Sequence, residues 1–270
     1  MYKIIACDLD ETLLGRDCKV SQRNREAIAA AQKKGVKFVP TTGRGYASIQ
    51  GTLEELGMRN AAGEYVISFN GGAITENAGN RLLHFETLSF AKAEEFYQRA
   101  MDYDVCIHVY TKEDVYAYAL NDGERAHLEG RMEVEEIFEK NLDFLKGQEI
   151  VKILFENTEE SYLRKIEADL ADLCDDIDVS FSSNRYIEFN PKGITKGTGL
   201  LKLAELLGVK QEETLAIGDN FNDLSMIRAA GLGVGVANAA EGIRKDCGYI
   251  TKAAFDQSAV AEAIEKFVLG

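Results

Sequence analysis

Short apolar runs that end at polar residues recur in the N-terminal and C-terminal thirds of the chain. The first run, Ile4–Cys7, is followed directly by Asp8, and Asp10 comes two residues later. Such a run predicts a strand that is buried on both faces, as in a parallel sheet. Because side chains alternate along a strand, Asp8 and Asp10 can project the same way just beyond its end.

Between these runs, apolar residues recur at helical spacing. The N-terminal pattern predicts strands near residues 3–7, 36–39 and 65–69, with helices near 21–34 and 46–56. Ser21 is a plausible N-cap of the first helix, and Gly35 follows its end. This β-α-β-α-β order predicts a doubly wound parallel sheet.

The pattern changes from about residue 81 to residue 189, where predicted strands follow one another without a helix between them. We expect strands near 105–110, 115–118, 151–155, 179–181 and 186–189, and helices near 90–101, 124–146 and 159–173. Helices packed on a mainly antiparallel sheet form an α+β domain. This segment is therefore predicted to be a separate domain.

The α/β order resumes after the turn at Asn190–Gly193. It predicts helices near 196–208, 224–230 and 258–268 and strands near 214–217, 232–236 and 249–250. We therefore predict an α/β fold with a Rossmann-like core, residues 1–81 and 190–270, and an inserted α+β domain, residues 82–189.

Charge and cysteine content limit the partners and the compartment. The formal net charge is -14, which disfavours nucleic acid and anionic membranes as partners. The 5 cysteines include no C-x-x-C pair, which favours reduced thiols and a cytoplasmic protein. No apolar run is long enough to span a bilayer, and Asp8 interrupts any signal-peptide core.

Polar clusters follow four predicted element boundaries. They are Asp8–Thr12, Thr41–Arg44, Lys196 and Gly218–Asp223. In one parallel sheet these groups can meet at the carboxyl edge, where such folds bind ligands. Clustered carboxylates call for a hard cation such as Mg²⁺, and the hydroxyl, backbone N–H groups and lysine suit a phosphate. This chemistry suggests phosphoryl transfer to an aspartate.

These motifs, in this order, resemble those of the haloacid dehalogenase superfamily, and most closely its Cof-type phosphatases with a C2-type cap. The two aspartates and the threonine are Asp8, Asp10 and Thr12, and the threonine-glycine-arginine element is Thr42–Arg44. The lysine element is Pro191–Gly197, and the acidic element is Gly218–Asp223. The resemblance covers essentially the whole chain and implies that residues 82–189 form the cap.

The resemblance also implies residue roles. Asp8 would be the nucleophile and Asp10 the general acid and base. Phosphate would be held by Leu9, Thr42, Gly43, Lys196 and Asn222. Mg²⁺ would be bound by Asp8, Asp10 and Asp219, with Asp223 orienting its waters. Arg44 and Asn70 would lie near the leaving group, with support of the local turn as the alternative.

The activity that the resemblance implies is Mg²⁺-dependent hydrolysis of small phosphomonoesters, such as sugar phosphates or phosphorylated cofactors, through an aspartyl phosphate. One alternative is a phosphosugar mutase with the same nucleophile. Another is a ligand-binding or regulatory protein of the same fold with little turnover. The expected partner is a small-molecule substrate, and the oligomeric state, monomer or dimer, stays open.

Overall fold

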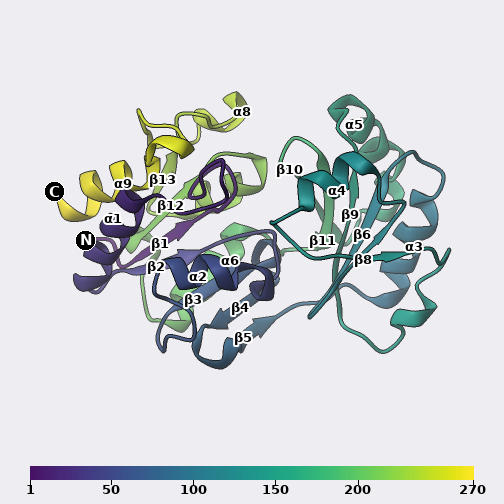
Figure 1. The fold of residues 1–270 in the computed structure, drawn as a ribbon, viewed down its shortest axis with the longest axis horizontal. Coiled ribbons are helices and arrows are strands. Elements are labelled where there is room, and N and C mark those ends of the chain that lie inside the picture. Colours follow the sequence, from purple (N-terminus) through teal and green to yellow (C-terminus); the bar gives the residue numbers. More distant parts are fainter. The chain divides into compact units, whose positions relative to one another are not determined.

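The computed structural model describes residues 1–270 and divides them into two compact units (Figure 1). Unit 1 comprises Met1–Phe85 and Thr195–Gly270, and unit 2 comprises Glu86–Ile194. The chain therefore leaves unit 1 once and returns to it once. These divisions fall a few residues later than the boundaries at 82 and 190 expected from the sequence.

Unit 1 is built on a five-stranded parallel sheet in the order β14-β13-β12-β1-β2. Its strands are β1 (Ile4–Cys7), β2 (Lys37–Pro40), β12 (Thr214–Gly218), β13 (Leu232–Gly235) and β14 (Tyr249–Ile250). Its helices are α1 (Gln22–Lys33), α2 (Gln50–Glu55), α6 (Lys196–Leu206), α7 (Leu224–Ala229), α8 (Glu241–Arg244) and α9 (Ala259–Ile264). The predicted α/β fold class is confirmed.

Strand β1 lies inside this sheet, between β12 and β2, and is buried on both faces. Ile4 and Ala6 belong to a buried apolar cluster with Leu200 of α6 and Met226 of α7. Burying an isoleucine side chain completely contributes about 1.5–3 kcal/mol. Helices α1 and α9 contact each other, and the Asn24 side chain accepts a hydrogen bond of 2.9 Å from the Ala261 N–H. Strand β1 is therefore held rigidly where it ends at Asp8.

The third predicted strand is not a full member of the parallel sheet. The three strands β3 (Tyr65–Ser68), β4 (Ala73–Glu76) and β5 (Arg81–Phe85) form an antiparallel sheet of their own. A single parallel bridge between Thr41 and Ile67 links β3 to the end of β2. The predicted third strand therefore forms parallel to β2, but it meets the parallel sheet only at this bridge, while its other edge pairs with β4 after the chain turns back at Gly71.

Unit 2 is a six-stranded sheet in the order β10-β11-β9-β6-β7-β8, antiparallel except for the pair β7 and β8. Its strands are β6 (Cys106–Thr111), β7 (Val115–Tyr118), β8 (Glu135–Ile137), β9 (Ile150–Glu156), β10 (Ile177–Ser182) and β11 (Tyr186–Pro191). Helices α3 (Phe90–Ala100) and α5 (Glu160–Asp169) cover one face and share its apolar core. Helix α4 (Asp122–Leu128) lies on the opposite face (Figure 1).

The long helix expected over residues 124–146 does not form. Helix α4 ends at Leu128, and Gly130 follows in a left-handed conformation with φ of 70°. Residues Glu135–Ile137 then pair in parallel with β7 as strand β8. The acidic composition suggested a solvated helix, but an available sheet edge determined the structure instead. The helix expected over 159–173 likewise ends at Asp169, and a 3-10 turn replaces its last part.

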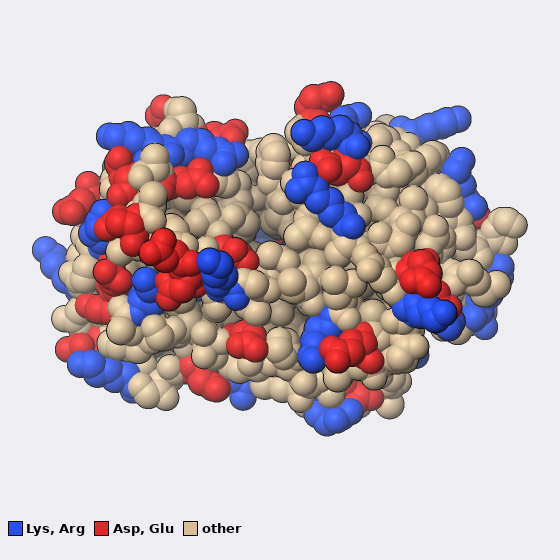
Figure 2. Space-filling view, turned by 180° about the vertical axis from the view of Figure 1, so that it is seen from behind, with Lys and Arg blue, Asp and Glu red and all other residues tan.

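Two surface features bear on function. None of the helices combines the length and the apolar composition that a membrane span requires. On the face shown in Figure 2, Lys and Arg side chains are interspersed with Asp and Glu side chains. With a formal net charge of -14 for the whole chain, binding an anion depends on cationic groups placed locally.

Candidate active site

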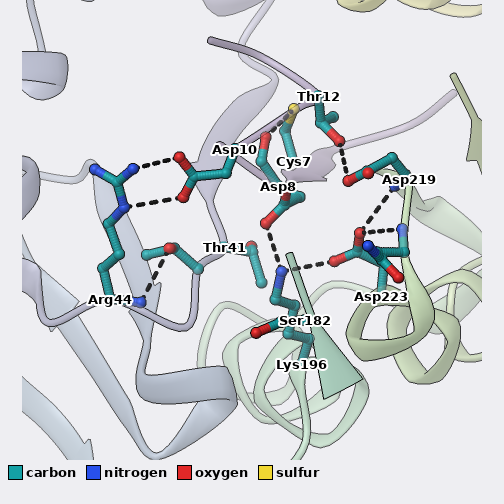
Figure 3. Close-up of polar contacts among 12 residues, drawn as sticks. Cys7, Asp8, Asp10, Thr12, Thr41, Arg44, Ser182, Lys196, Asp219 and Asp223 are labelled. Atoms are coloured by element: carbon teal, nitrogen blue, oxygen red, sulfur yellow. Dashed lines mark hydrogen bonds and ion pairs between the residues drawn. The ribbon is translucent and has the colours of Figure 1, made fainter. Parts of the chain in front are cut away.

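Three carboxylates and one lysine meet at the carboxyl ends of β1 and β12 in unit 1 (Figure 3). The Lys196 Nζ donates to Asp8 Oδ1 at 2.5 Å and to Asp223 Oδ1 at 2.6 Å. Lys196 is fully buried, and Asp8, Asp219 and Asp223 are also buried. The structure thus brings together the predicted polar clusters at residues 8, 196 and 219–223.

The turn after β12 orients the Asp223 carboxylate. Its Oδ2 accepts hydrogen bonds from the backbone N–H groups of Asp219 at 2.9 Å and Asn220 at 3.1 Å. A Cβ atom at Gly218 would lie 2.5 Å from the Asp223 carboxylate, so only glycine permits this close approach. Asp223 therefore joins the turn to Lys196.

Lys196 is positioned by close packing at the start of α6. The Gly197 N–H donates to Ser225 Oγ at 3.1 Å. A Cβ atom at Gly197 would lie 2.4 Å from the Ser225 carbonyl oxygen, so this helix start fits against α7 only with a glycine. Thr195 caps the helix by accepting from the Thr198 N–H at 3.1 Å. Ser225 was not predicted, because no motif marks it.

Thr12 supports the third carboxylate. Its hydroxyl donates to Asp219 Oδ1 at 3.0 Å. Between Asp10 and Thr12 the chain passes through Glu11, which takes a left-handed φ of 58° and whose carbonyl accepts from Asn238 Nδ2 at 2.9 Å. This conformation explains why the loop can reach back to Asp219. Asn238 is another supporting residue that the sequence pattern did not reveal.

The carboxylates carry more negative charge than Lys196 can neutralise. Burial, the nearby Asp223 charge and Asp10 raise the pKa of Asp8 to about 7, although Lys196 opposes the shift. Burial and the charges of Asp223 and Asp8 raise the pKa of Asp219 to about 9. Burial alone would lower the pKa of the Lys196 ammonium, but Asp223 and Asp8 raise it well above its usual value.

This donor set fits a divalent cation. Oxygen atoms of Asp8, Asp219 and Asp223 lie within 4.8 Å of one another. Oxygen ligands of this kind suit a hard cation such as Mg²⁺. A bound cation would also relieve the repulsion that raises these pKa values.

The loop after β2 contributes a hydroxyl and an arginine. The Thr42 Oγ1 accepts from the Arg44 N–H at 3.1 Å, which leaves the hydroxyl hydrogen for another acceptor. The Thr42 carbonyl accepts from the Asn70 N–H at 3.0 Å. Asn70 is buried and has a left-handed φ of 55°. Hydrogen bonds to Thr42 therefore join the loop that carries Arg44 to the turn that carries Asn70.

Asp10 faces Arg44 instead of the three carboxylates (Figure 3). Both oxygens of its carboxylate accept from the Arg44 guanidinium, with 2.9 Å between Arg44 Nε and Asp10 Oδ2. Arg44 was predicted to lie near a leaving group, but this ion pair could not be read from the sequence.

The remaining predicted residues lie beside these groups. The backbone of Leu9 runs between Asp8 and Asp10, and its side chain is fully buried. Gly43 follows Thr42, and its residue is half-buried. Asn222 is half-buried in the turn that carries Asp223. Their roles remain predictions.

Comparisons with known proteins agree with this arrangement. The family model described as haloacid dehalogenase-like hydrolase matches residues 5–264. Phosphatase YwpJ of Bacillus subtilis is 30% identical over 92% of this chain and 94% of its own length. The 5-amino-6-(5-phospho-D-ribitylamino)uracil phosphatase YcsE of Bacillus subtilis is 30% identical over 99% of this chain and 96% of its own.

A solved structure shows the same fold along the whole chain. A haloacid dehalogenase-like hydrolase from Bacteroides thetaiotaomicron superposes with a TM-score of 0.82 at 32% identity, covering 98% of this chain and 99% of its own. The family model also matches nearly the whole sequence. The chain therefore belongs to the haloacid dehalogenase-like hydrolases, which confirms the predicted superfamily, fold class and enzyme class, a phosphoric monoester hydrolase.

Proposed function

We propose that this chain is a Mg²⁺-dependent phosphatase that hydrolyses small phosphomonoesters through an aspartyl phosphate on Asp8. The observation that carries the proposal is the contact of Lys196 with both Asp8 and Asp223, beside Asp219. A nucleophilic carboxylate needs a neighbouring cation to approach an anionic phosphate, and Lys196 supplies one.

Mg²⁺ would be held by the Asp8 and Asp219 carboxylates and the Asp10 carbonyl oxygen, with Asp223 orienting its waters. When bound, the ion supplies positive charge that offsets the carboxylates and the substrate phosphate. The excess of buried carboxylates over Lys196 supports this assignment.

The chain's own groups would divide the binding of the phosphate among them. The proposed phosphate ligands are the N–H groups of Leu9 and Gly43, the Thr42 hydroxyl, the Lys196 ammonium and the Asn222 amide. Arg44 and Asn70 would lie on the leaving-group side. The Thr42 hydroxyl supports this division, because its oxygen accepts from the Arg44 N–H and its hydrogen can be donated to a phosphate oxygen.

Asp8 and Asp10 would perform the two chemical steps. An Asp8 oxygen bonds to phosphorus as the ester P–O bond breaks, and Asp10 gives its proton to the departing oxygen. Water then attacks phosphorus, the P–O bond to Asp8 breaks, and Asp10 takes the proton of the water. The second step returns both aspartates to their starting forms.

We infer that the substrate is a small phosphorylated alcohol, such as a sugar phosphate or a phosphorylated cofactor or cofactor precursor. The name of the relative YcsE, which acts on a phosphorylated ribitylamino-uracil, supports this class. Unit 2 would act as the cap that selects the substrate. We also propose a cytoplasmic location, because all five cysteines are free thiols.

A panel of phosphomonoesters, assayed for inorganic phosphate with Mg²⁺ and with a chelator, tests the proposal. We expect phosphate release that the chelator abolishes and that the Asp8→Asn variant lacks. Retained hydrolysis in Asp8→Asn would contradict the mechanism. Formation of an isomeric sugar phosphate without free phosphate would favour a mutase, and tight binding of one ester with very slow turnover would favour a regulatory protein.

A further inference from the structure

The Arg44 side chain is directed at a carboxylate of the chain itself. Its Nε donates to Asp10 Oδ2 at 2.9 Å, and its second terminal nitrogen donates to Asp10 Oδ1. Both side chains are largely shielded from water, with 15% exposed for Arg44 and 27% for Asp10. A planar guanidinium that engages both oxygens fixes the orientation of a carboxylate, which a single charge does not.

The backbone of Arg44 is itself held from two sides. The Arg44 N–H donates to Thr42 Oγ1 at 3.1 Å, and the Arg44 carbonyl accepts from the Phe69 N–H at 3.0 Å. The Phe69 ring also packs against Gly45, the residue after Arg44. A Cβ atom at Gly45 would lie 2.9 Å from Phe69 Cζ. These contacts use backbone atoms, so they persist when the Arg44 side chain is changed.

The backbone of Phe69 is strained in this arrangement. It has a left-handed φ of 51°, which is unusual for a bulky residue, and Asn70 follows at 55°. Strain of this kind persists where the surrounding structure requires it, and it concentrates at functional sites. Here the strained conformation directs the Phe69 N–H at the Arg44 carbonyl oxygen and so fixes the position of the Arg44 backbone.

We propose that Arg44 is a positioning residue that acts through Asp10, holding its carboxylate where it can exchange a proton with the leaving oxygen and then with water. This inference rests on the proposed function. Each Asp10 oxygen keeps a second lone pair beyond its hydrogen bond to Arg44. Asp10 can therefore stay bound to Arg44 and still exchange a proton.

The two chemical steps depend on Asp10 to different degrees with different esters. An alkoxide leaving group needs the Asp10 proton as its P–O bond breaks. A p-nitrophenolate leaves without that proton, yet the later attack of water on the aspartyl phosphate still needs Asp10 as base. Loss of Arg44 should therefore slow the first step with alkyl esters and only the second step with p-nitrophenyl phosphate.

The experiment compares Arg44→Ala and Arg44→Lys with wild type on an alkyl phosphate that the wild type hydrolyses and on p-nitrophenyl phosphate. We expect Arg44→Ala to lower kcat/KM for the alkyl ester by about 100-fold and for p-nitrophenyl phosphate by less than about tenfold. A burst of p-nitrophenol should appear in rapid mixing as the aspartyl phosphate accumulates. Arg44→Lys should lie between Arg44→Ala and wild type, and guanidinium ion should partly rescue Arg44→Ala.

Inhibition by inorganic phosphate separates positioning from substrate binding. If Arg44 acts through Asp10, the inhibition constant for phosphate should stay within about twofold of wild type in both variants. The matched control is Arg16→Ala. It removes an exposed ion pair elsewhere in unit 1, in which Arg16 lies 2.9 Å from Asp256. It should behave as wild type in every assay.

Three results would overturn the inference. One is an equal loss on both esters with a raised inhibition constant, which would make Arg44 a substrate ligand. Another is unchanged kinetics in both variants, and the third is the absence of a burst and of guanidinium rescue. If Arg44→Ala does not fold, Arg44→Lys and Arg44→Gln carry the same comparison. Failure of the wild type to release phosphate from any ester would instead contradict the proposed function.

Discussion

Two buried charged clusters, one in each unit, are neutralised in different ways. In unit 1, the Lys196 ammonium contacts the carboxylates of Asp8 and Asp223, and a third carboxylate, that of Asp219, lies beside these two. In unit 2, Glu124 and Glu156 share Arg185, which lies 3.1 Å from Glu124 Oε2 and 3.0 Å from Glu156 Oε1. Burial alone therefore does not distinguish them.

The unit 2 carboxylates also accept hydrogen bonds from neutral donors of the chain. Tyr186 donates to Glu124 at 2.6 Å, and Asn121 donates to Glu156 at 2.9 Å. Burial raises the pKa of Glu124, while the Tyr186 hydrogen bond and Arg185 oppose the shift. This network ties helix α4 to the face of the sheet that lacks α3 and α5.

The difference teaches what each cluster is for. The two unit 2 carboxylates outnumber their arginine by one and also accept from neutral donors, whereas the three unit 1 carboxylates outnumber Lys196 by two. The larger excess of like charge requires an external partner. The excess in unit 1 lies at the carboxyl edge of a parallel sheet, where ligands bind in this architecture. The same reasoning makes the unit 2 cluster a structural element, and four substitutions or additions can test the contrast.

The largest effect should come from Lys196→Met. It leaves the buried carboxylates without their ammonium, so we expect turnover to fall by about 10³-fold and the free energy of unfolding by about 3 kcal/mol. Phosphate release and urea unfolding measure the two effects. Lys202→Met, which removes an exposed pair with Glu205 on the same helix, is the control. Turnover within tenfold of wild type would contradict the assigned role of Lys196.

Arg185→Met should break the unit 2 cluster. Two buried carboxylates lose their shared cation, and we expect a loss of about 3 kcal/mol in the free energy of unfolding. Arg125→Met removes an exposed pair with Glu136 in the same unit and should cost less than about 1 kcal/mol. Urea unfolding measures both losses. Equal losses in the two variants would show that Arg185 does not stabilise the buried cluster.

Much of unit 1 could be predicted because its signals are local. The apolar run Ile4–Cys7 specifies a buried strand, and the aspartate that follows it must lie at the sheet edge. Lys196 and Asp219 were assigned to the same edge from their places in the α/β order. In the structure the parallel register of β1 and β12 places Asp8 beside Asp219, and Lys196, at the start of α6, contacts Asp8.

Pairings between distant segments could not be predicted. Whether Tyr65–Ser68 pairs with the parallel sheet or with a following strand depends on the strands that lie beside it. Glu135–Ile137 forms a strand because the edge of β7 is available for pairing. The contacts of Arg185 with Glu124 and of Arg44 with Asp10 follow from the tertiary arrangement. No spacing in the sequence encodes them.

Mg²⁺ should stabilise the protein through unit 1. At 100 times its dissociation constant a ligand adds about 2.7 kcal/mol to the free energy of unfolding. The Asp219→Asn variant should lose this gain. Burial and like charge raise the pKa of Asp219, and asparagine keeps the size of this side chain without its charge, so the variant should fold without Mg²⁺ about as well as wild type. Unfolding of both proteins with and without Mg²⁺ checks the prediction, which fails if Asp219→Asn gains as much as wild type.

The smallest effect should come from His108→Leu in unit 2. His108 is fully buried, and neither ring nitrogen has a hydrogen-bond partner, although Nε2 lies 3.4 Å from Glu124 Oε1. Burial, then the charges of Lys152, Arg185 and His127, lower the pKa of His108 to about 3, from 6.5 for an exposed histidine. Leucine has a similar size and removes no hydrogen bond, so stability at pH 7 should be unchanged or slightly higher.

The pH dependence gives this last substitution its sharper test. Between the two pKa values the unfolded chain binds a proton at His108 that the folded chain does not, so folding stability falls as the pH drops from 6.5 toward 3. From pH 6.5 to pH 5 this should cost wild type about 1.5 kcal/mol more than His108→Leu in urea unfolding. His84→Leu, on strand β5 of unit 1, is the matched control. Parallel stability curves for wild type and His108→Leu would mean that the unit 2 cluster accepts the proton on His108, most directly through Glu124, and is less closed than its contacts suggest.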